Sequence, residues 1–148
     1  MALLQNKKVR LSYEILKTFE AGMVLFGFEV KSLRTKHGIL EGAYIIVRGN
    51  EVFLVGMTIP PYQASNTPET YDPNRVRKLL LNMKEIQELG IAESEKGLTI
   101  VPISVYNSRG KIKIEIAIAR GRKKYDKRQV LKKRDDERDM RRTLKTQY

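Results

Sequence analysis

The residues of this sequence best suited to chemistry are its Lys and Arg side chains, which gather near the C-terminal end. The chain has 148 residues, with 29 Lys or Arg against 17 Asp or Glu. Residues 120–148 hold 13 of these cations and 5 of the acids, so two thirds of the net charge of +12 lies in the last fifth of the chain. An excess of this size indicates association with a polyanion, either nucleic acid or an anionic membrane surface.

The densest basic run covers residues 121–128 and includes an aromatic side chain, Tyr125. Lys and Arg that neutralise phosphates release counterions, which gives affinity independent of base sequence. A tyrosine among them offers a surface on which an unpaired base can stack. A short basic run can also be a solvated tail, but the bias continues to residue 145 and favours nucleic-acid binding. The residues of interest are Gly121, Arg122, Lys123, Tyr125, Asp126, Lys127 and Arg128.

A second group of cations, Arg75, Arg77 and Lys78, ends a long connection and directly precedes three leucines. One reading makes this the start of a strand or helix, with Leu79 and Leu81 in the core. Three cations so close together are better explained by contact with phosphate. The connection before them, residues 60–77, contains four of the five prolines, and a loop of this length is either disordered or functional.

Catalysis is not indicated by the sequence. There is no Cys, and the one histidine, His37, stands beside Gly38 at a predicted helix end, where a capping or solvent role is expected. No carboxylates have metal-ligand spacing, and no glycine-rich phosphate loop is present. No apolar run approaches the roughly 18 residues of a membrane-spanning helix. We therefore predict a cytoplasmic protein that is not an enzyme, needs no cofactor and does not bind membranes.

Alternating isoleucines predict a half-buried strand over residues 111–119. It forms a hairpin with residues 98–106, within which Pro102 indicates an edge position or a bulge. A second hairpin joins residues 43–47 to residues 52–55 through Gly49 and Asn50. Residues 15–26 give one or two further strands, bent or broken near Gly22. Strands of this number and length predict a small barrel or sandwich.

Two short helices are predicted. The first covers residues 29–36 and stops at Gly38. The second covers residues 83–89, with Asn82 at the N-cap, Glu85 three residues later and Gly90 past the end.

The charge distribution predicts two parts, a barrel over residues 1–119 and a basic tail over residues 120–148. Within the barrel, residues 1–10 are a candidate for disorder. The tail lacks both strand alternation and an apolar stripe, so we expect it to be disordered alone and helical when a polyanion neutralises it.

Four motifs in order resemble small protein B, the SsrA-binding protein family. The first two are Glu20-Ala21-Gly22 and Gly27-Phe28-Glu29-Val30-Lys31-Ser32-Leu33-Arg34. The others are Asp72-Pro73-x-Arg75-x-Arg77-Lys78-Leu79-Leu80-Leu81 and Ala119-Arg120-Gly121-Arg122-Lys123-x-x-Asp126-Lys127-Arg128. The resemblance runs from about residue 6 to the end of the chain.

The resemblance implies a fold and a function. The fold is an oligonucleotide-binding (OB-type) antiparallel β-barrel with short helices and a basic, conditionally ordered C-terminal tail. The function is trans-translation, in which the protein binds the tRNA-like domain of transfer-messenger RNA and delivers it to stalled ribosomes. Elongation factor Tu would be an indirect partner, through the aminoacylated RNA. The alternative is another OB-type ribosomal or single-strand RNA-binding protein.

The resemblance also implies which residues act. The tail run at residues 121–128 would enter the decoding centre and mRNA path of the small ribosomal subunit. Glu20, Leu80 and Lys113 gain a role only from the resemblance, since exposed charges are ordinary on the polar face of a sheet. The residues expected to contact RNA are Glu20, Lys31, Arg34, Arg75, Arg77, Lys78, Leu80, Lys113 and Arg120.

Overall fold

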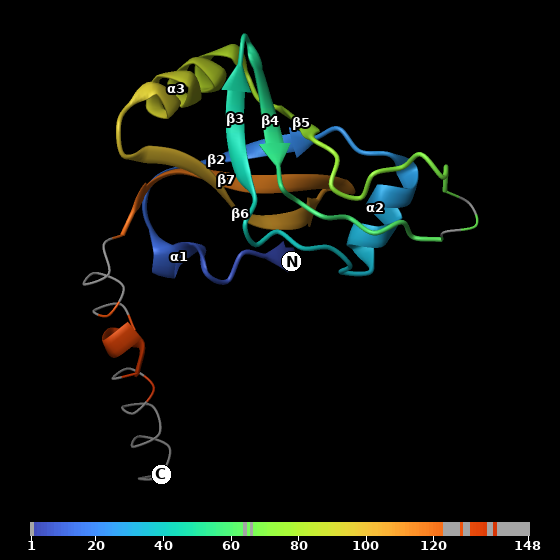
Figure 1. The fold of residues 1–148 in the computed structure, drawn as a ribbon, viewed down its shortest axis with the longest axis horizontal. Helices are drawn as coiled ribbons and strands as arrows, with labels where there is room; N and C mark the ends of the chain where they lie inside the picture. The colour runs from blue at the N-terminus through green and yellow to red at the C-terminus, as the bar shows by residue number, and fades with distance from the viewer. Residues whose placement is uncertain are drawn as a thin grey trace.

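The structure is a computed structural model that describes residues 2–63, 65, 67–122, 128, 131–135 and 138. It contains a seven-stranded antiparallel sheet in the order β1-β6-β3-β4-β5-β2-β7, in which β6 also pairs with β7. Hydrogen bonding therefore runs in a closed ring through β6, β3, β4, β5, β2 and β7, and β1 is added to β6. Helices α2 and α3 lie at opposite sides of this barrel (Figure 1). The prediction of an antiparallel β-barrel with short helices is confirmed.

The bounds of the elements give the frame for the site. In chain order they are β1 (Ala2–Gln5), α1 (Val9–Ser12), β2 (Tyr13–Met23), α2 (Gly27–Arg34), β3 (Tyr44–Arg48), β4 (Glu51–Val55), β5 (Arg77–Leu80), α3 (Met83–Ser94), β6 (Leu98–Ser108) and β7 (Lys111–Gly121).

The predicted hairpin of the two longest strands is confirmed, and it forms much of the barrel wall. Ile112, Ile114, Ile116 and Ile118 of β7 all belong to the core, as their period-two spacing requires. The turn takes left-handed backbone angles at Arg109 (φ 51°) and Gly110 (φ 78°). The expected irregularity at Pro102 is a shift in the pairing of β6 with β7 between Pro102 and Ser104.

Strand β2 changes its hydrogen-bonding partner near its end. It pairs with β7 from Tyr13 to Gly22 and with β5 at Gly22 and Met23. Gly22 is therefore opposite Leu80 on one side and Lys113 on the other. The predicted break at Gly22 is the point where three strands meet.

The N-terminal segment, a candidate for disorder over residues 1–10, forms β1 and α1 among its described residues. Ala2–Gln5 pairs with β6, and Val9 in α1 is 3% exposed. Val9 packs with Val101, Ala117 and Ala119 on the face of the β6–β7 hairpin that points away from the isoleucines. The physical reason is that this end of the hairpin is apolar on both faces, so a second segment must cover it.

Helix α2 begins and ends differently from the prediction. It runs from Gly27 to Arg34, and its end is formed by Lys36, which takes a left-handed conformation (φ 62°), and not by Gly38. The N–H groups of Lys36 and His37 donate to the carbonyls of Leu33 and Ser32. This pair of bonds is the Schellman motif, formed here without glycine at its usual position.

Helix α3 has the predicted start, but it continues to Ser94 and does not stop at Gly90. The Asn82 side chain accepts a hydrogen bond from the N–H of Glu85, and the Glu85 side chain accepts one from the N–H of Asn82. Gly90 is a contact residue: a Cβ at this position would lie 3.8 Å from Cγ1 of Val47. This is an ordinary van der Waals distance, so at this point the helix packs against β3.

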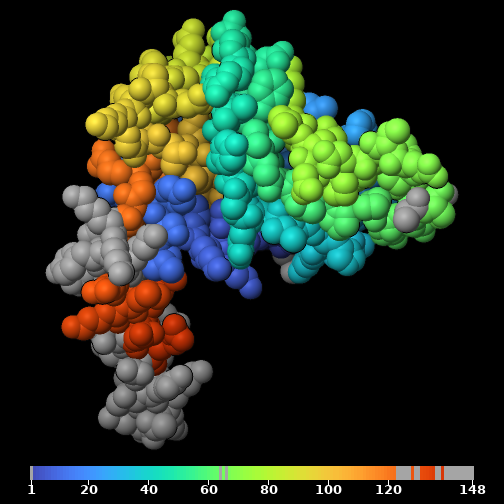
Figure 2. Space-filling model, viewed as in Figure 1, coloured from blue at the N-terminus to red at the C-terminus, as the bar shows by residue number. Residues whose placement is uncertain are grey.

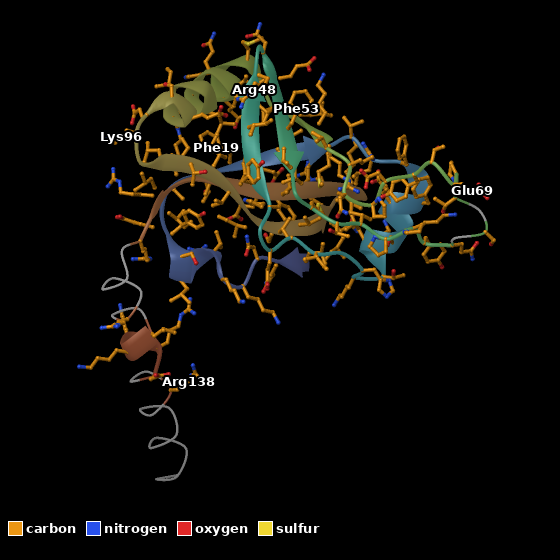
Figure 3. All side chains as sticks on the ribbon, in the orientation of Figure 1. Phe19, Arg48, Phe53, Glu69, Lys96 and Arg138 are labelled. Atoms are coloured by element: carbon orange, nitrogen blue, oxygen red, sulfur yellow. The ribbon has the colours of Figure 1, made fainter. Side chains whose placement is uncertain are left out.

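The long connection between β4 and β5 extends away from the barrel, with Glu69 near its outer end, whereas Arg48 marks the tip of the β3–β4 hairpin (Figure 3). Strand β7 continues to Gly121, two residues beyond the predicted boundary of the barrel. The N–H of Arg122 then donates to the carbonyl of Ser12 at 2.8 Å, and the end of β7 lies beside the N-terminal segment in Figure 2.

Among the described residues of the tail, 131–135 are helical. No helix within the described part of the chain is long and apolar enough to cross a membrane.

Candidate nucleic-acid interface

An exposed groove opens where β5, β2 and β7 meet. It has a volume of about 310 Å³ and is lined by apolar and cationic side chains. Gly22 forms its floor, because a Cβ there would lie 3.4 Å from Cβ of Leu80 and 3.7 Å from Nζ of Lys113. The missing side chain keeps open the space between these two residues. The lining residues are Gly22, Met23, Leu25, Val30, Arg34, Leu80, Gly110, Lys111, Ile112 and Lys113.

A second hollow adjoins the first. It is lined by Glu20, Ser108, Arg109, Lys111 and Lys113, so the two share Lys111 and Lys113. We call the two hollows together the barrel groove. The structure thus brings together four of the predicted RNA-contacting residues, Glu20, Arg34, Leu80 and Lys113.

Both cationic and apolar side chains line the barrel groove. Arg34, Arg109, Lys111 and Lys113 line it, and the guanidinium of Arg34 donates to the carbonyl of Gly110 at 3.0 Å. This bond ties the end of α2 to the β6–β7 turn. Leu80, which also lines the groove, is 53% exposed. Cations suit phosphates, and an exposed apolar side chain between them suits the face of a base.

Glu20 brings a negative charge to this basic surface. Its carboxylate accepts a hydrogen bond from the hydroxyl of Tyr106 on β6. Burial raises the pKa of Tyr106, and the hydrogen bond to Glu20 raises it further. The hydroxyl therefore remains protonated, and a donor, at neutral pH.

Arg77 is not available to RNA, and its predicted role as a contact is wrong. Its side chain is fully buried and forms a two-pronged ion pair with Glu29, with both distances between 2.8 and 2.9 Å. The reason is strand alternation: Arg77 lies two residues before the core residue Leu79 and shares its face, whereas Lys78 and Leu80 face outward. Arg77 also donates to the carbonyls of Met57 and Pro73, which holds the long connection in place.

The same buried cluster contains Arg75 and Tyr71. Arg75 is ion-paired with Glu29, and its guanidinium lies 4.2 Å from the centre of the Phe26 ring. The Tyr71 hydroxyl lies 2.9 Å from a carboxylate oxygen of Glu29 and 2.8 Å from the carbonyl oxygen of Ile59, and it accepts from Arg77. Burial, then the bond to Glu29, raises the pKa of Tyr71 to about 12.

Glu29 remains ionised although it is completely buried. Burial alone would raise its pKa. Hydrogen bonds from Arg75, the N–H of Phe26, Arg77 and Tyr71 outweigh this and hold the pKa below its ordinary value. We call Glu29, Tyr71, Arg75 and Arg77 the buried ion cluster.

The remaining predicted contacts lie outside the barrel groove. Lys31 is exposed on α2, and Arg120 is exposed near the end of β7. Lys78 is exposed and pairs with Glu51 at 3.4 Å. Arg75 is only partly exposed, and its charge is balanced by Glu29.

Of the predicted ribosome contacts, three fall on described residues. Gly121 ends β7, and Nε of Arg122 donates to the carbonyl of Arg10 at 3.2 Å. Arg128 is exposed. A cavity of about 620 Å³ lies beside this start of the tail, between α1 and β3, and Arg122 lines it. Lys123, Tyr125, Asp126 and Lys127 lie outside the described residues.

Sequence reasoning missed three side chains of this surface, Arg109, Lys111 and Tyr106. The signal for the first two was present, since both flank the glycine of a predicted hairpin turn beside Lys113. The approach of Tyr106 to Glu20 has no local signal, because the two are 86 residues apart in the chain. Among the described residues, no group of three or more His, Asp or Glu is placed to hold a metal ion.

Comparison with known proteins gives the context of this surface. The family model described as SmpB protein matches residues 3–146. The chain belongs to the SmpB protein family. Relatives named SsrA-binding protein include that of Gloeothece citriformis, 46% identical over 140 residues, which is 95% of this chain and 90% of the relative. That of Ruthia magnifica is 47% identical over 140 residues, 95% of this chain and 85% of the relative.

A solved structure of an SmpB protein has the same fold. It comes from the study described as "tmRNA-SmpB: a journey to the center of the bacterial ribosome". The match has a TM-score of 0.68 and 37% sequence identity, and covers 86% of this chain and 93% of the other. The likeness of this SmpB-family chain to small protein B, including the OB-like sheet, is confirmed.

Proposed function

We propose that this SmpB-family protein is the RNA-binding adaptor of trans-translation. It binds the tRNA-like domain of transfer-messenger RNA and delivers this RNA to stalled ribosomes. The observation that carries the proposal is the family match over residues 3–146, which includes both the barrel and the tail. The barrel groove supports it independently, because cations that can neutralise phosphates line it together with an exposed leucine.

We assign RNA binding to the barrel groove. Arg34, Arg109, Lys111 and Lys113 would neutralise phosphates, and Leu80 would pack on a base or sugar. Glu20 would accept a hydrogen bond from a base amino group, as a carboxylate beside phosphate-binding cations can. Lys31, Lys78 and Arg120 remain predicted contacts at the periphery, and Arg75 is a weaker one because Glu29 already balances its charge.

We assign ribosome binding to the tail. The run at residues 121–128 would enter the decoding centre and the mRNA path, where its cations meet ribosomal RNA. Elongation factor Tu would join indirectly, through the aminoacylated RNA. The proposal needs no catalytic residue and no cofactor, and it places the protein in the cytoplasm with the ribosome.

A truncation tests this division of labour. Because β7 ends at Gly121 and Arg122 is anchored to Ser12, the chain should be cut after Arg122 and not after Ala119. We expect the truncated protein to keep its unfolding transition and most of its affinity for the tRNA-like domain, and to lose tagging on stalled ribosomes. Normal tagging by the truncated protein would refute the role of the tail.

The second candidate is another OB-type protein that binds ribosomal or single-stranded RNA. A competition at one salt concentration separates the two, since salt changes all such affinities. Preference for the tRNA-like domain over an unstructured strand of equal length supports the adaptor. Equal affinity for both would favour the second candidate.

A further inference from the structure

Tyr106 lies where it can control the carboxylate of Glu20. On the outer face of the barrel, Tyr106 is opposite Lys113, and Lys113 is opposite Gly22. Two residues further along these strands, on the same face, Glu20 is opposite Glu115. The Tyr106 hydroxyl reaches diagonally across β7 to donate to Oε2 of Glu20. Tyr106 therefore contacts Glu20 of the barrel groove from β6, a strand that is not paired with β2, which carries Glu20.

The setting of Glu20 is unfavourable for stability. Like charges directly opposite each other on neighbouring strands destabilise a sheet, and Glu20 faces Glu115 in this way. Within the described part of the chain, the Tyr106 hydroxyl is the one hydrogen-bonding or ion-pairing group that holds the Glu20 side chain. An exposed acid that stability does not explain, on a protein with a net charge of +12, suggests a binding role.

We infer that Tyr106 is a positioning residue, which orients Glu20 so that the free Oε1 accepts a hydrogen bond from an N–H group of an RNA base. This inference rests on the proposed function, in which the barrel groove holds RNA. A phosphate is excluded as the partner of Oε1, because both would be negatively charged. Lys111 and Lys113, on the neighbouring strand, would bind the phosphates. The cations would thus contact the RNA backbone, and the carboxylate would contact a base.

The physical gain comes from restricting one side chain. A free glutamate on a strand surface loses side-chain entropy when it binds, and part of this cost is removed if the carboxylate is already held in place. Tyr106 keeps its proton at neutral pH, so it donates to Glu20 throughout the physiological range. Phenylalanine at position 106 would keep the ring and remove only this donor.

A double-mutant cycle with the tRNA-like domain tests the inference. We expect Tyr106→Phe to weaken binding about fivefold and Glu20→Ala about tenfold, as for hydrogen bonds to charged groups. The double variant should bind no more weakly than Glu20→Ala alone. Tyr44→Phe is the matched control, a half-exposed strand tyrosine that should change nothing.

Salt dependence supplies a readout that a structural role would not reproduce. Lys113→Ala removes a phosphate contact and should lower the slope of log affinity against log salt by about one. Tyr106→Phe should leave this slope unchanged, because it removes no phosphate contact. If Tyr106→Phe also lowers the slope, it acts by displacing Lys113, and the inference is wrong.

The remaining outcomes separate this inference from the proposed function. If Glu20→Ala weakens binding but Tyr106→Phe does not, the site stands and the role of Tyr106 is refuted. The same holds if Tyr106→Phe costs as much without Glu20 as with it. If neither Glu20→Ala nor Lys113→Ala weakens binding, the barrel groove itself is not the RNA site, and both proposals for it fall.

Discussion

The buried ion cluster and the barrel groove both contain arginine and glutamate, and they share two segments of the chain. Helix α2 supplies Glu29 to the cluster and Arg34 to the groove, and β5 supplies Arg77 to the cluster and Leu80 to the groove. In the cluster every charge is paired, and both Glu29 and Arg77 are excluded from water. In the other, the cations are exposed and an apolar side chain stands among them.

The difference shows that the position of a cation along a strand, as well as its charge, determines whether the side chain is buried or exposed. Neighbouring residues of a strand point to opposite faces, so Arg77 and Lys78 have opposite environments although they are adjacent. The cluster anchors the long connection and the start of α2, and it thereby fixes the element that carries Arg34. One region supplies rigidity, and the other supplies contacts.

The largest expected effect comes from removing Arg77. Arg77→Ala removes one of the two ion-pair partners of the buried Glu29 carboxylate, and the one that is itself fully buried, which costs about 3–5 kcal/mol of unfolding free energy. Urea unfolding measures this. Lys78→Ala is the matched control and should cost less than about 0.5 kcal/mol, because Lys78 is exposed. Equal losses of stability in the two variants would contradict the assignment of Arg77 to the buried face of β5 and Lys78 to its exposed face.

Charge reversal in the barrel groove should affect binding and not folding. Lys113→Glu places a third acid beside Glu20 and Glu115, and we expect the affinity for the tRNA-like domain to fall about tenfold or more, by about 1–2 kcal/mol. Lys84→Glu, on the exposed surface of α3, makes the same charge change outside the groove and is the control. A similar loss in both would mean that total charge, and not the site, determines affinity.

The two adjacent leucines of β5 should separate stability from binding. Leu80→Ala is expected to weaken RNA binding by about 0.5–1 kcal/mol while leaving the unfolding free energy within about 0.5 kcal/mol. Leu79 is 1% exposed, and Leu79→Ala should cost about 2–5 kcal/mol of stability through the cavity that it leaves. Titration of RNA and urea unfolding on both variants measure the two quantities, and a stable Leu79→Ala protein would be inconsistent with the core described above.

The smallest expected effect near neutral pH is the change in stability caused by titration of Glu29, because this carboxylate is protonated only in acid. The folded-state pKa lies below the ordinary value of 4.5, so the stability from the ionised form is present above that value and is lost as the pH falls through the folded pKa. Below pH 4.5 the unfolding free energy of the unmodified protein should therefore fall more steeply than that of Glu29→Gln. Glu69→Gln, in the exposed loop, should follow the unmodified protein. Parallel curves for all three would remove Glu29 as the acid-sensitive group.

Sequence patterns predicted the parts of the fold that depend on residues close together in the chain. The isoleucines of β7 gave the strand and its buried face, and Asn82 with Glu85 gave the start of α3. The packing of the N-terminal segment was not predicted, because Val9 is buried against Ala117 and Ala119, which are distant in the sequence. Gly90 was misread as a stop, since its close approach to Val47 depends on tertiary packing.

The site was predicted in part, and one error was avoidable. The expectation that Leu79 is in the core already implied that Arg77 shares its buried face. That Glu29 neutralises it was not predictable, because the partner lies on a helix 48 residues away in the chain. Glu20, Leu80 and Lys113 were predicted from the family resemblance, and only the meeting of three strands at Gly22 shows why they belong together.

The pairing of β2 with β7 has a consequence for the synthesis of this protein. Residues 13–22 find their longest partner only in residues 113–121, near the end of the chain. Until the ribosome has made and released β7, both β2 and β6 lack the strand with which they share most of their hydrogen bonds, so the barrel cannot close. A nascent chain interrupted before Gly121 would expose the edges of two long strands and would be a target for aggregation or proteolysis. By this topology, a protein that serves stalled ribosomes depends on a ribosome that translates its own message at least as far as Gly121.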